Sequence, residues 1–186
     1  MTAISAYDND GRFQAVTVGS AAPDFVLKDQ QNCEWRLSDH LGNVVVLLFY
    51  PQNETLVCTR QLCSVRDNWK NYLETKAEIV GISPATPEEH NHFSQSRSLP
   101  IPLLADEGRD VTKIYGKHWL YPLNFTRAVV VIDAKGIIRN RDIMLRAFRP
   151  SDLTLITDIY AARSDAFNET RDALRSRLSG LVNKKS

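Results

Sequence analysis

Seven consecutive apolar residues, from Val44 to Tyr50, place the strongest constraint on how this chain of 186 residues can fold. A segment that is apolar on both of its faces fits a strand at the centre of a sheet, covered by helices on each side. Pro51 ends this strand, because proline cannot donate a hydrogen bond to a sheet ladder. The run is far shorter than the roughly 20 apolar residues of a membrane-spanning helix, so we expect no contact with a membrane.

The rest of the chain alternates between strand and helix patterns. Thr55 is a candidate N-cap, and the apolar residues from Val57 to about Lys76 recur at helical spacings, which predicts one long helix. Further strands are expected at residues 25–28, 33–37, 77–83, 101–104, 127–133 and 137–145, and further helices at 88–96, 111–115 and 151–163. This alternation, with a late hairpin, predicts an α/β fold in which helices flank a central mixed β-sheet.

We expect three parts along the chain. Residues 1–17 lack periodicity and form an N-terminal arm, residues 18–163 form the main domain, and residues 164–186 form a C-terminal helical extension. A second apolar stripe lies in this extension, at Phe167, Leu174, Leu178 and Leu181. The stripe must pack either on its own domain or on a second copy of the chain, so the sequence is compatible with a monomer or a homodimer.

The composition excludes several classes of protein. With 23 Lys and Arg against 22 Asp and Glu, the net charge of +1 argues against a nucleic-acid partner. The N-terminus carries acidic residues where a signal peptide needs a positive end, so we expect a cytoplasmic protein. Three cysteines are too few for a disulfide scaffold, and their odd number leaves at least one thiol free.

Cys58 is the candidate reactive residue, because it follows the junction between the buried strand and the long helix. In the first turn of a helix, the macrodipole and the free amides favour an anion, so we expect the pKa of this thiol to lie below its ordinary value. The thiolate is the form that attacks electrophiles. Nearby Thr55 and Pro51 support this interpretation, and the alternative is an inert core cysteine on the apolar stripe.

Cys63 follows Cys58 by five residues on the same predicted helix. Helix geometry separates the two Cα atoms by roughly 8.6 Å, whereas a disulfide needs about 4.4–6.8 Å. If the two thiols form a bond, the first helical turns must therefore unwind. Alternatively, Cys63 is an ordinary residue of the helix surface. A zinc site is disfavoured because neither His90 nor His92 belongs to a matching ligand pair, and the absence of a C-x-x-C motif argues against a dithiol oxidoreductase.

The segment around Cys58 resembles a family signature. Pro51-x-x-x-Thr55-x-x-Cys58 is similar to the P-x-x-x-T-x-x-C motif of peroxiredoxins. The position of Cys63 resembles the bacterioferritin comigratory protein (PrxQ-like) branch of the alkyl hydroperoxide reductase/thiol-specific antioxidant family. The likeness extends over residues 18–160 in the family's order, with further matching segments at 21–25, 80–83, 90–93, 103–106, 115–116 and 127–133.

This resemblance implies a thioredoxin-like fold and a thiol-dependent peroxidase that reduces hydrogen peroxide and organic hydroperoxides. Cys58 would be the peroxidatic cysteine, and Cys63 would resolve its sulfenic acid as an intrachain disulfide. Thioredoxin or a similar dithiol reductant would recycle the enzyme, without a metal or an organic cofactor. Thr55 would hydrogen-bond the reacting oxygen, Pro51 would shield the pocket, and Arg127 would supply a fixed positive charge.

One position departs from the family pattern, since Leu56 stands where proline commonly follows the motif threonine. Proline would stiffen the approach to the helix, so we expect a looser pocket or a shifted peroxide preference. Cys33 lies outside the motif and is expected to be a spectator thiol. Two other functions fit the same fold: a protein disulfide oxidoreductase without peroxidase activity, and a redox-sensing or chaperone-like binding protein.

Overall fold

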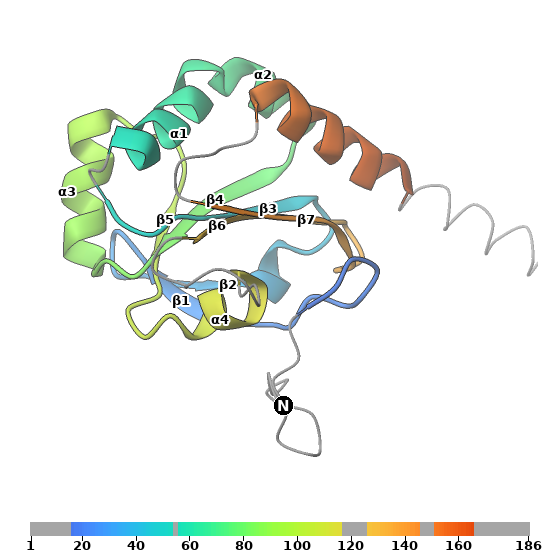
Figure 1. The fold of residues 1–186 in the computed structure, drawn as a ribbon, viewed down its shortest axis with the longest axis horizontal. Helices are drawn as coiled ribbons and strands as arrows, with labels where there is room; N and C mark the ends of the chain where they lie inside the picture. Colours follow the sequence, from blue (N-terminus) through green and yellow to red (C-terminus); the bar gives the residue numbers. More distant parts are fainter. Residues whose placement is uncertain (1–15, 54–55, 117–125, 146–150, 166–186) are drawn as a thin grey trace, which may run out of the picture.

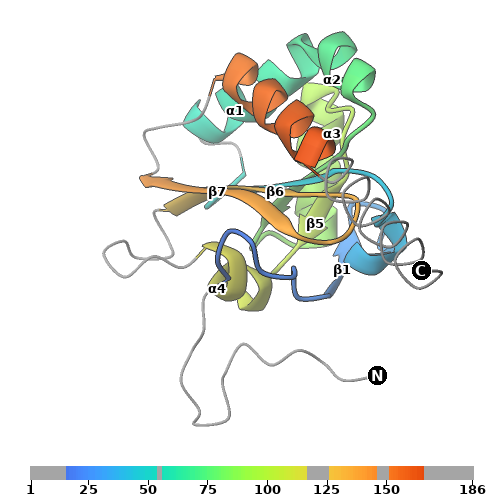
Figure 2. The same cartoon turned by 90° about the vertical axis from the view of Figure 1, so that its right-hand side faces the viewer.

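A seven-stranded mixed sheet lies between two layers of helices (Figures 1 and 2). The computed structural model describes residues 16–53, 56–116, 126–145 and 151–165. The strands are β1 (Val26–Asp29), β2 (Glu34–Arg36), β3 (Val45–Phe49), β4 (Glu78–Ser83), β5 (Leu103–Ala105), β6 (Thr126–Ile132) and β7 (Ile138–Leu145). The helices are α1 (Leu56–Asp67), α2 (Trp69–Thr75), α3 (Pro87–Arg97), α4 (Asp110–Gly116), the short 3-10 helix η1 (Leu37–His40) and a C-terminal helix at residues 152–165.

Strand β3 lies inside the sheet, in the order β2-β1-β5-β4-β3-β6-β7. It pairs in parallel with β4 and antiparallel with β6, and all five of its residues are buried. Successive side chains of a strand point to opposite faces. Accordingly, Val46 and Leu48 join the core cluster that includes α1, α2 and the C-terminal helix, whereas Val45 and Leu47 join the cluster that includes α4. The predicted central strand and the α/β class are confirmed.

The predicted helix from Val57 to Lys76 is wrong in one detail, because it is two helices. Helix α1 ends at Asp67 and α2 begins at Trp69, with Asn68 between them at φ −102° and ψ 17°. The Asn68 side chain donates to the Ser64 carbonyl at 3.1 Å, one turn earlier in the chain. Asparagine competes in this way for backbone groups and favours helix boundaries. The apolar stripe continues across the break, which is why the spacing alone did not reveal it.

The C-terminal helix begins where the sequence predicts it. The Ser151 hydroxyl accepts a hydrogen bond from the Thr154 amide at 3.1 Å, as an N-cap does. Leu155 and Ile159 are buried in the core cluster that this helix shares with β3 and β6. The helix is described through residue 165, whereas the stripe at 167–181 and residues 1–15 of the arm lie outside the described residues. The three-part division therefore stays a prediction. In the part of the chain that the structure describes, no helix is both long and apolar enough to cross a membrane.

Candidate functional site

The end of β3 and the beginning of β6 bring the predicted site residues into one region. Phe49 pairs with Ala128 in the β3–β6 register, so the next residue outward on each strand is Tyr50 on one side and Arg127 on the other. Pro51 follows Tyr50 and is buried, and α1 begins five residues later at Leu56. Pro51 and Arg127 therefore lie at the same end of strands β3 and β6. The helix that carries both cysteines begins at that end as well.

Arg127 is the best-defined member of this site. Its side chain is 0% exposed, and its Nη1 donates a hydrogen bond to Oε1 of Gln61, which is itself buried. Gln61 lies three residues after Cys58, and residues at this spacing share one side of a helix. The guanidinium of an arginine is a positively charged group with five N–H donors. A fixed positive charge is therefore held against the first turns of α1, and Gln61 is a contact that the sequence analysis missed.

The backbone of Cys58 lies in the first turn of α1, as the sequence predicts. No acidic side chain stands in that turn, and a helix N-terminus favours negative charge. The side chain of Cys58 and the whole of Thr55 lie outside the described residues, so their predicted roles rest on the sequence. Leu56, in the place of the usual proline, is the first residue of the helix.

Cys63 is a half-buried free thiol on α1. Because α1 is continuous from Cys58 to Cys63, the two Cα atoms are separated by the roughly 8.6 Å of an intact helix. A disulfide between them therefore requires α1 to unwind. Arg66 lies one turn beyond Cys63; its pKa is raised, mainly by its hydrogen bond to Asp67 and to a lesser degree by its electrostatic interaction with Cys63.

A carboxylate of the C-terminal helix anchors the chain just after Cys63. Asp152 accepts hydrogen bonds from the hydroxyl of Ser64, from Nδ2 of Asn68 at 3.2 Å and from the hydroxyl of Tyr72 at 2.7 Å. These three donors span the end of α1 and most of α2. The Asp152 contacts thus attach the α1–α2 junction to the C-terminal helix, while the first turns of α1 have no part in them.

A buried histidine makes polar contacts with the segment that precedes α1. His90 of α3 is 0% exposed, and its Nδ1 lies 3.4 Å from both the Tyr50 hydroxyl and the Asn53 Nδ2. Its Nε2 lies 3.2 Å from the Leu104 carbonyl and 3.4 Å from the Ser83 hydroxyl. Burial lowers the pKa of His90 below its ordinary value of 6.5. The sequence pattern assigns His90 no role, since nothing in it places this residue beside the segment 51–53.

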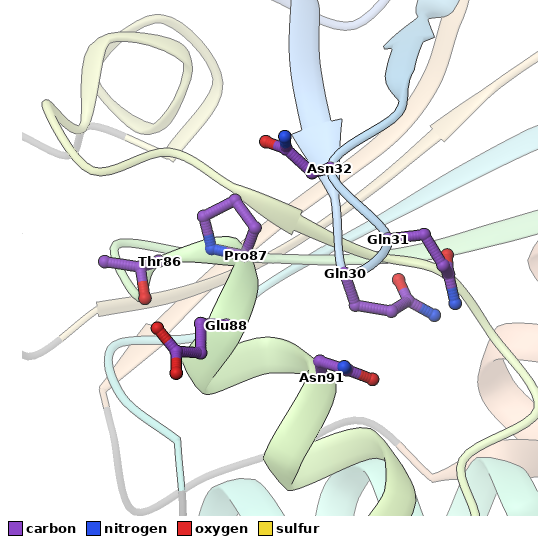
Figure 3. A pocket seen from close by; sticks show the side chains of 7 residues that line it. All are labelled: Gln30, Gln31, Asn32, Thr86, Pro87, Glu88 and Asn91. Atoms are coloured by element: carbon purple, nitrogen blue, oxygen red, sulfur yellow. The ribbon is translucent and has the colours of Figure 1, made fainter.

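A separate hollow of about 510 Å³ lies between the β1–β2 turn and the start of α3 (Figure 3). Its lining residues are Gln30, Gln31, Asn32, Thr86, Pro87, Glu88 and Asn91, none of which is a predicted site residue. A capping box at the start of α3 satisfies the amides of Thr86 and Glu89 there. Across the described ranges, no group of three or more His, Cys, Asp or Glu side chains is arranged to hold a metal ion.

Comparison with known proteins gives consistent results. Residues 18–141 match the AhpC/TSA family. The chloroplastic peroxiredoxin Q of Sedum lineare is 40% identical over 128 residues, 68% of this chain and 69% of the relative. The chloroplastic peroxiredoxin Q of Arabidopsis thaliana is 39% identical over 128 residues, which are 68% of this chain and 59% of the relative.

Solved structures share the fold. The peroxidoxin BcpB of Mycobacterium tuberculosis aligns with a TM-score of 0.67 at 29% identity, over 78% of this chain and 97% of that one. The bacterioferritin comigratory protein of Xanthomonas campestris aligns with the same TM-score of 0.67 at 19% identity, over 75% of this chain and 92% of that one. These likenesses confirm the expected thioredoxin-like fold.

Proposed function

Since this chain belongs to the AhpC/TSA family, in the branch of peroxiredoxin Q and bacterioferritin comigratory protein, we propose that it works as a two-cysteine peroxidase. Family membership makes it a peroxiredoxin, and thus a peroxidase; the proposal assigns the roles of Cys58 and Cys63, the substrates and the reductant. The observation that carries the proposal is the buried Arg127, bonded to Gln61 one turn after Cys58.

The first step is the attack of the Cys58 thiolate on one oxygen of a peroxide. The O–O bond breaks, the sulfur gains the terminal oxygen as a sulfenic acid, and the leaving oxygen takes a proton to become water or an alcohol. Sulfur is oxidised by two electrons and the peroxide is reduced by two. The Arg127 charge and the amides of α1 stabilise the thiolate and the negative charge that develops on the oxygens. Thr55 orients the reacting oxygen, and Pro51 keeps water from the pocket.

The second step joins the two cysteines. The Cys63 thiol attacks the sulfur of the Cys58 sulfenic acid, an S–S bond forms, and water leaves. This step requires α1 to unwind between Leu56 and Cys63, since the intact helix keeps the thiols too far apart. The Asp152 contacts begin at Ser64, one residue after Cys63, so the helix beyond it stays in place while its first turns open.

A dithiol protein completes the cycle. Thioredoxin or a similar reductant exchanges its two thiols for the Cys58–Cys63 disulfide, restores both cysteines and leaves as a disulfide. Hydrogen peroxide and organic hydroperoxides are the proposed substrates. We place the reaction in the cytoplasm, with the chain acting as a monomer or a homodimer.

Mass spectrometry after a single oxidation tests this proposal. One equivalent of hydrogen peroxide is added to the fully reduced protein, and intact mass and peptide maps are recorded over time. We expect a rapid loss of two mass units and a Cys58–Cys63 linked peptide. In Cys63→Ser, we expect a Cys58 sulfenic acid that dimedone traps.

Cys33→Ser is the matched control, because Cys33 is an exposed thiol outside α1. This variant should oxidise at the wild-type rate and give the same linked peptide. If Cys58 stays reduced while the other thiols react slowly, the peroxidase assignment fails and a binding or sensing role replaces it. If Cys58 oxidises and then forms a disulfide with Cys33 or with a second chain, the assignment of Cys63 as the resolving cysteine is wrong.

A further inference from the structure

The hydrogen bonds around His90 determine which of its nitrogens carries the proton. The Leu104 carbonyl, 3.2 Å from Nε2, can only accept, so Nε2 is the protonated nitrogen and Nδ1 is an acceptor. The Tyr50 hydroxyl donates to Oδ1 of Asn53 at 2.9 Å, which directs the Asn53 amide group toward His90. Asn53 Nδ2 is therefore the donor that faces Nδ1. This neutral tautomer satisfies every polar group in the chain of contacts.

These contacts connect the sheet to the segment that enters α1. The chain of hydrogen bonds runs from Leu104 of β5 through His90 of α3 to Asn53, and Tyr50 at the end of β3 closes it. Gly81 of β4 makes room for this arrangement, since a Cβ there would lie 3.2 Å from the Tyr50 ring. Asn53 stands between the buried Pro51 and the first residue of α1. The side chain of Asn53 is thus held by the fully buried His90 and by Tyr50.

We propose that neutral His90 is a positioning residue for the peroxidase reaction, which holds Asn53 and through it the segment that presents Cys58. The inference rests on the proposed function of Cys58. The contacts of His90 that the structure describes run to Asn53, Tyr50, Ser83 and Leu104. A proton on Nδ1 would set a donor against the Asn53 amide and a charge in a fully buried place, both of which cost free energy. Protonation therefore releases Asn53 and loosens the approach to α1.

The groups that act on the ring come from each of the packed elements. They are the Tyr50 phenol of β3, the Ser83 hydroxyl of β4, the Leu104 carbonyl of β5, the Asn53 amide and, through its charge, Glu89 of α3. The Glu89 carboxylate is itself engaged by the Thr86 amide at 2.8 Å. Only Tyr50 and Glu89 among these groups carry ionisable side chains.

The test measures the second-order rate of peroxide reduction against pH in wild-type protein, His90→Gln and Asn53→Ser. Glutamine does not titrate, and Asn53→Ser removes the link while His90 stays in its buried place. We expect each variant to lose about tenfold at neutral pH, within the roughly 100-fold that a 1 Å misplacement costs. The double variant should lose no more than either single one, because both break the same connection.

The pH dependence of the rate of peroxide reduction distinguishes a positioning role of His90 from an effect of His90 on stability alone. On the acid side, wild-type activity should fall with the protonation of two groups, the Cys58 thiolate and neutral His90, whereas His90→Gln should keep only the protonation of Cys58. His92→Gln is the matched control, since His92 is an exposed histidine of the same helix; it should follow the wild-type profile. If wild-type protein reduces no peroxide, the proposed function itself fails. If it does, and the variants keep its rate and profile or only lower the melting temperature, the role of His90 is wrong.

Discussion

Arg127 carries a charge in a place that solvent does not reach, and its geometry explains how the charge can act at Cys58. Its Nη1 is bonded to Gln61, and Gln61 is on the helix that carries the cysteine. A guanidinium that is already oriented needs no reorganisation when negative charge develops in the reaction. In the proposed mechanism Gln61 is therefore the residue that orients Arg127, although the motif does not include it.

Removal of the Arg127 charge should lower the rate of peroxide reduction more than removal of the Gln61 side chain that orients it. We expect Arg127→Gln to lower kcat/KM for hydrogen peroxide by about 100-fold or more, the usual effect of losing one stabilising donor. Gln61→Leu should lower it by about tenfold, because the guanidinium stays but is less well placed. Arg141→Gln is the control: Arg141 is a half-buried arginine of β7 that donates to the Tyr115 carbonyl at 2.8 Å. Equal losses in all three variants would contradict a specific role for Arg127.

His90 also links the stability of the fold to pH. Its folded pKa lies below the ordinary 6.5, so below about that pH the unfolded chain binds more protons than the folded one. The stability that neutral His90 provides is complete above pH 6.5 and is lost as the pH falls from there toward the folded pKa. Urea unfolding at about pH 7.5 and about pH 5.5 should therefore show a smaller acid-induced loss in His90→Gln than in wild type or His92→Gln. The same loss in all three proteins would assign the effect to other groups.

The elements of the fold differ in how far the sequence alone could predict them. An apolar run such as β3, or the stripe of α1, is a local pattern, and local patterns reveal a strand or a helix together with the face it buries. The break at Asn68 was missed because a side-chain hydrogen bond interrupts the helix without disturbing the apolar spacing. The contact of Asp152 with Ser64 joins residues 88 positions apart, and no periodicity encodes such a pair.

The same limit applies to the site. Pro51, Thr55 and Cys58 stand together in one short motif, so their spacing was enough to propose a reactive thiol. Gln61 and His90 have no such local signal. Their roles depend on which strands lie side by side, and this information comes from the register of β3 with β6 and from the position of α3 over β4 and β5.

The C-terminal helix should control how easily α1 opens. Asp152→Ala removes three hydrogen bonds to a carboxylate, so we expect a loss of about 2–4 kcal/mol in the free energy of unfolding. The reaction of Cys58 with peroxide should stay within about twofold of wild type, since the Arg127 contacts are intact. The later formation of the disulfide should become faster, because the helix beyond Cys63 is less firmly held.

Stopped-flow tryptophan fluorescence can follow both steps, since Trp69 of α2 packs against the core beside this junction. Asp158→Ala is the control on the same helix; its carboxylate accepts a hydrogen bond from Asn140 of β7 at 2.7 Å. This control should lower stability without changing the disulfide step. A slower disulfide step in Asp152→Ala would show that the anchor assists resolution rather than restraining it.

Two hydrophobic clusters, one on each face of the sheet, stabilise the molecule through β3 and β6, and both strands contribute side chains to both clusters. A conformational change that reached this sheet would expose both cores at once. Opening of the first turns of α1 exposes much less, chiefly Leu62, whose burial is worth roughly 1.5–3 kcal/mol. The structure therefore predicts that the redox cycle moves one edge of the molecule and leaves the sheet unchanged.

Hydrogen exchange measured by mass spectrometry on the reduced and the oxidised chain tests this prediction. Oxidation should speed the exchange of amides at about residues 60–63, because these amides donate helical hydrogen bonds to the first turn of α1 and lose them when the disulfide forms, whereas the first four amides of a helix have no partner within it. Amides of β3, of β4 and of α2 should keep their protection, because the cores and the Asp152 contacts hold them. Cys63→Ser is the matched control: peroxide oxidises its Cys58, but no intrachain disulfide with residue 63 can form, so the amides of about residues 60–63 should stay protected. Faster exchange throughout the sheet of the wild-type chain would contradict a local opening and would mean that resolution requires a global rearrangement.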